Sequence, residues 1–544
     1  MTEAQPHLVD TGCGHTVSYR GKTLYSPRNP RGAAIRRVEK LEVQPGTLIF
    51  IPSLGLGYGL PELLEKLPPS CHVLCVEADE QLFKLGISQE QPLPKSAHLT
   101  IIRTDGPQHA AATVQKIGPW RFRRVVPLHL CAGYQFHRRT YGLLLEAVEE
   151  EIRLFWQNKL TLVAMTELWL KNLFTNLRAL PAAGDIADLA TELPIVVCGA
   201  GPSLERSLEW IRVIREQVIL MCVDTALPAL ADAALLPDWV FTLDAQLYTL
   251  EDFIPSRDSR IALICDLTSN PLVLRLFPNI FFCATRFHPL SLFDRLEAAS
   301  LLPSALPPRG SVGVSAVEAA LSITSGPVLF TGLDFSYTGN QSHARGTPSH
   351  LRMLRGCRRL QPCGMIPFET LLARPRLWLS GKGGNRVLTD LVLQSYARQL
   401  RSVCEQTSGC FDLSTEGLPV GAERITRLSE LIGLCNPPRG SAEGTGGAAR
   451  AAVQSPRRLK AGSDAVQRFC EQEQGLLSQV ERSIAQSSRI PSDALLPVEY
   501  LLLPFPQADP DQTLSAQNLS QVEKLAGTLR MCLERTRLAL KAGQ

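Results

Sequence analysis

The stretch LPIVVCGAGPSL, residues 193–204, decides the fold of the central part of this chain. Its apolar run 195–198 predicts a strand that is buried on both faces of a sheet. Two glycines follow at once, and the apolar spacing from Leu204 onward predicts an amphipathic helix. A strand that turns through glycines into a helix is typical of a Rossmann-like unit, whose backbone amides bind phosphate. A tight structural turn is the alternative for a lone Gly-x-Gly. The predicted phosphate-binding residues are Gly199, Gly201, Pro202 and Ser203.

Apolar and helical segments alternate through the rest of this region, which predicts a parallel sheet with crossover helices. The predicted strands are 195–198, 218–223, 239–243, 261–265, 280–283 and 328–331. The carboxyl ends of parallel strands share one edge of a sheet, where ligands bind. Polar residues follow three of these strands, and another loop precedes a helix in the manner of an anion site. The residues predicted to contact a nucleotide are therefore Asp224, Thr225, Asp244, Gly310 and Ser311.

The first 135 residues are predicted to form another Rossmann-like domain after a polar lead-in over 1–45. Its strand at 48–51 runs into a glycine-rich loop at 55–59, and a second strand ends beside Glu77. This unit resembles an S-adenosylmethionine-binding fold, but no methyltransferase motif follows Glu77. We therefore predict a structural or substrate-positioning role for this domain.

The remaining boundaries follow from changes in composition. Helical periodicity predicts a connector over 136–192, in which Asn172 and Asn176 lie one turn apart. Such a pair more often bonds to a neighbouring helix than to a ligand. The central Rossmann-like domain is predicted over 193–435. A Gly-, Ala-, Ser- and Arg-rich flexible linker is predicted over 436–462, and a helical region over 463–544.

The composition argues against several classes of protein. The net charge is only +4 over 544 residues, and basic residues gather only in short clusters such as Arg121–Arg124 and Arg355–Arg359. A nucleic-acid partner is therefore not expected. No signal peptide or membrane-spanning run is visible, and the 15 cysteines have no metal-ligand spacing. We expect a reduced cytoplasmic protein without a disulfide framework, a transmembrane segment or a metal.

These motifs together resemble the motility accessory factor (Maf) family of bacterial flagellin glycosyltransferases. The shared domain of that family is also similar to the archaeal 6-hydroxymethylpterin diphosphokinase MptE. The Gly-Pro-Ser loop and the late Gly-x-Asp-Phe segment resemble the bacterial sialyltransferases of glycosyltransferase family 42 as well. The segments that carry the resemblance are 199–204, 224–227, Pro237-Asp238 leading to Asp244, 310–312, 332–337 and 342–344. The first domain is also similar to the Maf amino-terminal domain.

The resemblance implies an enzyme that transfers a nonulosonic acid, of the pseudaminic, legionaminic or sialic type, from its CMP-activated form to Ser or Thr of flagellin. It further implies metal-independent transfer with inversion, in support of flagellum assembly and motility. A histidine is the natural base near neutral pH. Of the two histidines that follow the last strand, His343 is preferred to His350 because it lies in the Ser-His-Ala stretch, and Asp334 is predicted to orient it or bind the sugar.

Two other functions fit the same motifs. One is an MptE-like pyrophosphotransferase, which requires ATP and magnesium. The other is a non-catalytic nucleotide-binding partner of flagellin. The sequence leaves open the sugar, the acceptor-binding surface and the oligomeric state.

Overall fold

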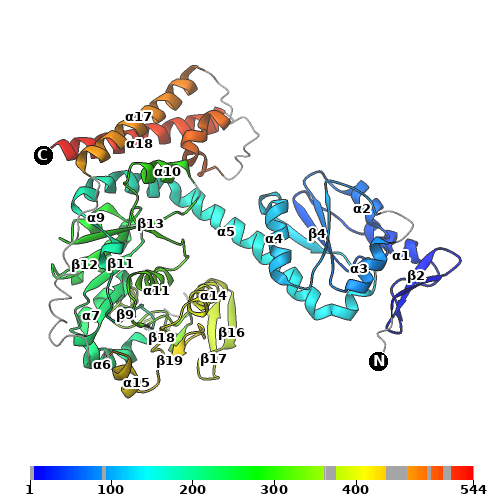
Figure 1. Ribbon diagram of the computed structural model, residues 1–544, viewed down its shortest axis with the longest axis horizontal. Helices are drawn as coiled ribbons and strands as arrows, with labels where there is room; N and C mark the ends of the chain where they lie inside the picture. Colours follow the sequence, from blue (N-terminus) through cyan, green and yellow to red (C-terminus); the bar gives the residue numbers. More distant parts are fainter. Residues whose placement is uncertain are drawn as a thin grey trace. The chain divides into compact units, whose positions relative to one another are not determined.

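The computed structural model describes residues 5–88, 93–288, 290–360, 362, 375–435, 462–486, 492–505 and 516–542. The chain forms two compact units, Met1–Val163 and Ala164–Gln544, which divide within the long helix α5 (Arg138–Asn176). Both units combine a parallel sheet with covering helices, and the carboxyl-terminal region is helical (Figure 1). The predicted fold class is confirmed. The domain boundaries expected from the sequence stay predictions.

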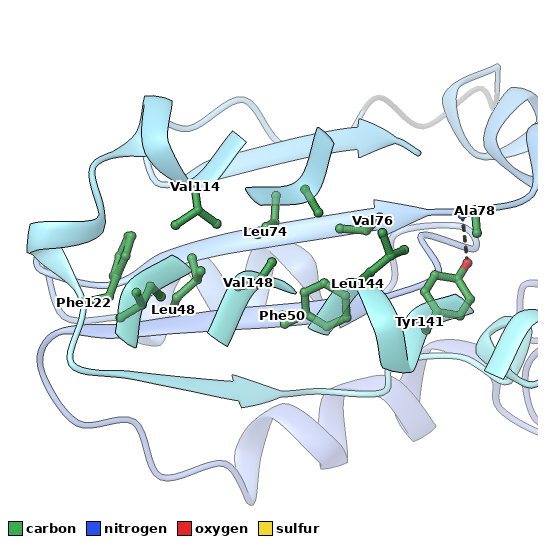
Figure 2. Packing of buried hydrophobic residues seen from close by; sticks show 12 residues of the cluster. Leu48, Phe50, Leu74, Val76, Ala78, Val114, Phe122, Tyr141, Leu144 and Val148 are labelled. Carbon is green, nitrogen blue, oxygen red and sulfur yellow. Dashed lines mark hydrogen bonds between the residues drawn. The ribbon is translucent and has the colours of Figure 1, made fainter. Parts of the chain in front are cut away.

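The first unit is built on a parallel sheet in the order β6-β5-β4-β7. Its strands are β4 (Thr47–Pro52), β5 (His72–Glu77), β6 (Leu99–Arg103) and β7 (Arg124–Pro127), and its crossover helices are α2 (Leu60–Lys66), α3 (Glu80–Ile87) and α4 (Pro107–Ile117). One face of the sheet packs against α4 and the start of α5. Figure 2 shows Phe50 and Val76 beneath Leu144 and Val148 of α5, with Tyr141 accepting a hydrogen bond from the Ala78 amide.

The prediction of a polar lead-in over 1–45 is wrong for its described part. These residues form an antiparallel sheet of β1 (His7–Asp10), β2 (His15–Tyr19) and β3 (Lys22–Thr23), followed by helix α1 (Pro30–Glu39). Val17 and Tyr19 of β2 are 0% and 2% exposed in a small apolar cluster with Tyr25. Sequence periodicity misses such strands because each is short, and β1 and β3 bury no side chain at all.

The second unit contains a parallel sheet in the order β14-β13-β12-β11-β10-β9-β15-β18-β19, with β8 beside β13. The chain starts at β9, proceeds outward through β10 and β11, and later returns to place β15 on the other side of β9. The edge between β9 and β15 is therefore a topological switch point, where ligands bind in open α/β sheets. The strands are β8 (Gly184–Asp185), β9 (Ile195–Cys198), β10 (Ile219–Val223), β11 (Trp239–Thr242), β12 (Ala262–Asp266), β13 (Ile280–Thr285), β14 (Ala305–Leu306), β15 (Val328–Thr331), β18 (Cys410–Asp412) and β19 (Glu423–Arg424).

Helices cover this sheet, and a separate antiparallel hairpin joins it near β15. The helices are α6 (Leu204–Ile214), α7 (Leu227–Asp232), α8 (Leu250–Phe253), α9 (Pro271–Leu274), α10 (Ser291–Ala298), α11 (Val312–Ile323), α12 (Pro348–Gly356), α14 (Leu391–Gln406) and α15 (Leu428–Cys435). The hairpin consists of β16 (Arg376–Ser380) and β17 (Arg386–Asp390). Its second strand accepts a hydrogen bond from the chain after β15, because the Tyr337 amide donates to the Leu388 carbonyl at 2.8 Å.

The carboxyl-terminal region contains α17 (Ser463–Gln486), the 3₁₀ segment η10 (Ser492–Leu502) and α18 (Ala516–Ala542). The helices α17 and α18 lie side by side (Figure 1). A buried ion pair fastens them to the unit: Glu473 is 0% exposed and accepts two hydrogen bonds from the Arg295 guanidinium. The linker predicted over 436–462 lies outside the described residues, Gly462 apart. Within the described ranges, no helix has the length and apolar character needed to cross a membrane.

Candidate functional site

The Gly-Pro-Ser loop lies at the switch point of the large sheet and packs directly against the loop after β15. A Cβ on Gly199 would lie 2.5 Å from the Gly332 carbonyl oxygen, and one on Gly201 would lie 2.7 Å from the same atom. Gly332 itself has φ +69°, in the left-handed region that favours glycine. The two glycines before the helix are therefore required by the close approach of a second strand end.

The amides of this loop already have protein acceptors. Gly201 N donates to the Gly332 carbonyl at 2.8 Å, and Ser203 N donates to Asp334 Oδ2 at 2.9 Å. Pro202 has no amide to offer, and its carbonyl accepts from Glu205 N at 3.3 Å. A phosphate at this loop therefore has to use other donors, which departs from the expectation that the amides of Gly201 to Ser203 bind it.

Asp334 lies behind the loop in a buried group of charges. It is 2% exposed, and its Oδ1 has no hydrogen-bond partner among the described residues. Burial raises the pKa of Asp334, while its bonds to Ser203 and the charge of Lys382 oppose that rise. Lys382 Nζ lies 2.6 Å from Asp412 Oδ2, and both side chains are 1% exposed. Asp334 thus positions the Gly-Pro-Ser loop through its bond to Ser203, and its predicted role in orienting His343 or binding the sugar stays a prediction.

The backbone around Asp334 is strained on both sides. Phe335, the next residue, has φ +49°, which a bulky side chain rarely adopts. Gly417 has φ +96°, and a Cβ there would lie 2.4 Å from the Asp334 carbonyl oxygen. Strain of this kind collects at functional sites, where the surrounding structure enforces it. In the sequence, the Gly-x-Asp-Phe segment marks the position of this strained backbone.

The two aspartates predicted after β10 and β11 lie close enough for their charges to interact. Asp224 is 4% exposed, and it accepts hydrogen bonds from Thr225 N and from the Thr242 and Thr225 hydroxyls. Burial raises the pKa of Asp224, and the charge of Asp244 raises it further. Asp244 is only half-buried and accepts from the Gln246 amide at 2.9 Å. Asp244 is therefore the more accessible of the two for a ribose hydroxyl.

A third acid of this group escaped the sequence reasoning. Asp252 of α8 is 8% exposed, and burial together with the charge of Asp224 raises its pKa to about 7. Arg352 of α12 interacts electrostatically with Asp252 and also with His343, whose pKa is lowered by burial and then by that same arginine. His343 Nδ1 lies 2.9 Å from Ser342 Oγ. The acids after β10 and β11 and the predicted base thus belong to one group of interacting charges at the sheet edge where the nucleotide is predicted, and we call this group the nucleotide crevice (Asp224, Asp244, Asp252, His343 and Arg352). Nothing in the local sequence around Asp252 marked it, because its pKa depends on strands distant along the chain.

The second predicted anion loop precedes α11. Ser311 is the residue before the helix and its carbonyl accepts from Ser315 N, while the Gly310 amide lies 3.3 Å from Gln399 Oε1 of α14. The first amides of a helix have no intrahelical acceptor and favour an anion. A Cβ on Gly313 would lie 2.4 Å from Leu333 Cδ2, so the start of α11 packs beside the loop after β15.

Asn172 and Asn176 of α5 have a structural role. Asn172 Nδ2 donates to the carbonyls of Ala245 and Thr268, and Asn176 Nδ2 donates to those of Leu267 and Ser269. They therefore hold the loops after β11 and β12 in place. We expected a ligand or a neighbouring helix as their partner.

In the first unit, the corresponding sheet edge is occupied by contacts within the protein. Glu77 accepts hydrogen bonds from Ser53 Oγ, Leu54 N, Asp79 N and Tyr141 Oη. A Cβ on Gly55 would lie 2.3 Å from the Tyr25 hydroxyl oxygen. Because a carboxylate offers about four lone-pair sites, no site is left for a ribose. These contacts favour the predicted structural role over nucleotide binding.

Two findings concern metals and cysteines. Within the described part of the chain, no three His, Cys, Asp or Glu side chains gather closely enough to hold a metal ion. Metal independence itself stays a prediction. Cys357 is disulfide-bonded, whereas the expectation from the sequence was a reduced protein without a disulfide framework.

Comparison with known proteins now places the chain. A family model described as 6-hydroxymethylpterin diphosphokinase MptE-like matches residues 168–340, which hold most of the crevice. An uncharacterized protein of Treponema pallidum (strain Nichols) is 30% identical over 423 residues, which cover 76% of this chain and 73% of that protein. This chain belongs to the same family as that protein, and its residues 168–340 match the MptE-like domain. A second uncharacterized protein of the same organism is 35% identical over 81 residues, which are 15% of this chain and 39% of that protein.

One solved structure shares the fold of this MptE-like protein over its whole length. It is the Maf glycosyltransferase from Magnetospirillum magneticum AMB-1, which matches with a TM-score of 0.59 over 99% of this chain and 91% of that chain. The sequence identity is 17%, so the likeness concerns the fold. The resemblance expected from the sequence, to Maf proteins and to the MptE-like domain, is confirmed.

Proposed function

We propose that this protein is a glycosyltransferase that moves a nonulosonic acid from a CMP-activated donor to Ser or Thr of flagellin. The observation that carries the proposal is the nucleotide crevice at the switch point of an MptE-like sheet. There a histidine that favours its neutral form lies in the same electrostatic group as Asp224 and Asp244. The fold shared with a Maf glycosyltransferase supports the same conclusion.

His343 is the proposed base. Burial and Arg352 lower the pKa of His343, so at neutral pH its imidazole is neutral and ready to accept a proton. In the proposed step the acceptor hydroxyl gives its proton to the imidazole while its oxygen bonds to the anomeric carbon of the sugar. The bond from that carbon to the phosphate oxygen breaks, and CMP leaves with the electron pair. Attack from the face opposite CMP inverts the anomeric carbon.

The departing phosphate requires donors other than the amides of Gly201 and Ser203. We propose that Ser311 and the first amides of α11 supply them, since a helix start favours negative charge, whereas the Gly310 amide already donates to Gln399. Arg352 adds a cation to the crevice, although it also pairs with Glu251 at 2.9 Å. Asp244, with one oxygen bound by Gln246, is the proposed partner of the ribose, and Thr225 lies at the end of the neighbouring strand β10.

The test is the intact mass of flagellin produced in cells with and without this protein. We expect a mass increase of one sugar or more that disappears with His343→Gln and persists with the matched control His350→Gln, seven residues away on the same segment. Identical flagellin masses with and without the protein would refute the transferase. Loss with the His350 variant alone would move the base to that residue.

The family model also favours a second function, an MptE-like pyrophosphotransferase. Calorimetric titration separates the two. We expect CMP to bind without magnesium and ATP with magnesium to show no turnover. Magnesium-dependent consumption of ATP would support the second function. Binding of CMP together with an unchanged flagellin would indicate a non-catalytic flagellin partner.

A further inference from the structure

A pocket of about 290 Å³ opens on the side of the switch point away from the nucleotide crevice. It is lined by the chain after β15, by the β16–β17 hairpin and by the loop after β18. In the sheet, β15 and β18 lie on one side of β9, whereas the acids of the nucleotide crevice follow β10 and β11 on the other side. The pocket is thus distinct from the crevice, yet it adjoins the same Gly-Pro-Ser loop.

The connection to that loop is direct. Glu416 of the pocket forms an ion pair with Arg206 of α6, the helix that the loop starts. Lys382, also in the lining, pairs with Asp412 in the buried group that holds Asp334 and Ser203. A ligand in the pocket would therefore lie against the same elements that position the Gly-Pro-Ser loop.

One wall of the pocket is an aromatic ring that the fold leaves open. Trp378 of β16 is 57% exposed, which is unusual for so large an apolar side chain. The Arg386 guanidinium lies 5.9 Å from the centroid of the Trp378 ring, and its Nη2 is 3.5 Å from the Trp378 carbonyl. The arginine is exposed and has no carboxylate partner among the ion pairs of the described residues. A flat apolar face and a cation therefore stand side by side at the mouth of the pocket.

The rest of the lining offers short polar groups of both kinds. Asn340 and Asn385 provide amides, which donate and accept, and Thr338 and Thr415 provide hydroxyls or their backbone. The volume lies at the low end of the range of about 300–1,000 Å³ for small-molecule sites. Such a space suits a single ring with many hydroxyl groups and is small for a nucleotide sugar.

We propose that this pocket binds one ring of an acidic saccharide. Trp378 stacks on the apolar face of the ring, Arg386 pairs with its carboxylate, and the amides bind its hydroxyls. The choice of an acidic sugar rests on the proposed function as well as on Arg386. The pocket then holds a sugar beside the transfer site, either on the glycosylated product or ahead of the next transfer.

The experiment uses the full chain labelled with 5-fluorotryptophan and followed by fluorine NMR. The chain has six tryptophans, and Trp120 of the first unit is 58% exposed, which makes it a matched internal control. Variants Trp378→Phe and Trp120→Phe assign the two signals. The probe is N-acetylneuraminate, and its methyl ester, which lacks the charge, is the control ligand.

We expect N-acetylneuraminate to shift the Trp378 signal and to leave the Trp120 signal in place. The methyl ester should bind about threefold more weakly, and Arg386→Gln should remove that difference, since an exposed ion pair contributes a factor of up to about five. Saturation-transfer NMR of the probe should weaken by a similar factor in Trp378→Ala, with thermal unfolding confirming that this variant is folded.

An unmoved Trp378 signal at millimolar probe, or equal binding to Trp378→Ala, would overturn the proposal. A preference for the acid that persists in Arg386→Gln would overturn the role of the arginine. Titration of the same samples with CMP keeps the proposals apart. CMP binding that survives in Trp378→Ala supports two separate sites, whereas failure of CMP alone to bind counts against the proposed function and leaves the saccharide pocket standing.

Discussion

Replacing Gly201 by alanine tests whether the switch point is held by backbone packing. The new Cβ would lie 2.4 Å from Asp334 Oδ2 and 2.7 Å from the Gly332 carbonyl oxygen, closer than real Cβ contacts. One of these atoms belongs to the backbone and the other to a buried carboxylate, so neither moves easily. Two hydrogen bonds depend on the same spacing, Gly201 N to Gly332 O at 2.8 Å and Ser203 N to Asp334 Oδ2 at 2.9 Å.

The expected loss follows from these contacts. Overpacking costs about 1–3 kcal/mol, and weakening a buried hydrogen bond to a charged acceptor costs about 1.5–3 kcal/mol. We expect Gly201→Ala to lower the free energy of unfolding of the second unit by about 3 kcal/mol. The matched control is Gly475→Ala in α17, where a Cβ meets nothing within 4 Å. That change should stabilise by about 0.5–1 kcal/mol because alanine is the better helix former.

Hydrogen exchange read by mass spectrometry over a urea series measures both variants. Peptides of the second unit report its stability, and peptides of the first unit serve as an internal reference. Gly201→Ala should increase exchange throughout the sheet around β9 and leave the first unit unchanged. If Gly201→Ala is as harmless as Gly475→Ala, the packing argument is wrong and the glycine is needed only for a ligand.

Three further perturbations probe other parts of the second unit. Asp252 has a folded pKa of about 7, above its unfolded value, so it binds its proton more tightly in the folded state, and the free energy of unfolding should fall as pH rises from about 4 to about 7. Urea unfolding at pH 5 and pH 8 should show a smaller loss of stability in Asp252→Asn than in the unchanged protein. An equal loss in both proteins contradicts the assignment. Lys382→Met leaves Asp412 buried without its cation and should cost about 3–5 kcal/mol of unfolding free energy. Adding Asp412→Asn should restore much of it, and simple additivity of the two changes in urea unfolding would argue against a coupled pair. Glu473→Ala strips Arg295 and Tyr500 of their shared acceptor and should speed proteolysis of α17 and α18, whereas an unchanged cleavage rate means that apolar packing alone holds these helices.

The sequence was sufficient for the elements whose signal is local. Every strand predicted in the large sheet is present, because each is a continuous apolar run between glycine or polar turns. The helix predicted from Arg138 onward is also present as α5. The hairpin β16–β17 was missed because each strand has only five residues, and β16, which alternates exposed and half-buried positions, buries none of them. Local patterns of that length are ambiguous without their tertiary partners.

The candidate site shows a different limit. Residue types and strand ends predicted that Asp224, Asp244 and His343 lie at one edge, and the charges of Asp224 and Asp244 do interact, since topology alone brings strand ends together. They did not reveal that Ser203 N is bound by Asp334, because that contact joins residues 131 positions apart. They also did not reveal Asp252, whose perturbed pKa comes from burial against another strand end. Which residues become hydrogen-bond partners within a site depends on tertiary packing, and a sequence motif does not specify it.

The two Rossmann-like sheets of this chain differ in how they treat the acid at the end of the second strand. In the first unit Glu77 is surrounded by donors from its own neighbourhood, so the fold supplies everything the carboxylate needs. In the second unit the charge of Asp224 raises the pKa of Asp252, and the charge of Asp244 raises the pKa of Asp224, an arrangement that weakens the folded state when these acids are ionised. The second unit thus tolerates charge repulsion at a position where the first unit fully satisfies the equivalent acid. Unrelieved repulsion of this kind is typical of a ligand-binding site. In the proposed function, the hydroxyl groups of the bound donor would therefore hydrogen-bond to the acids of the nucleotide crevice and so relieve the repulsion that the protein alone leaves in place.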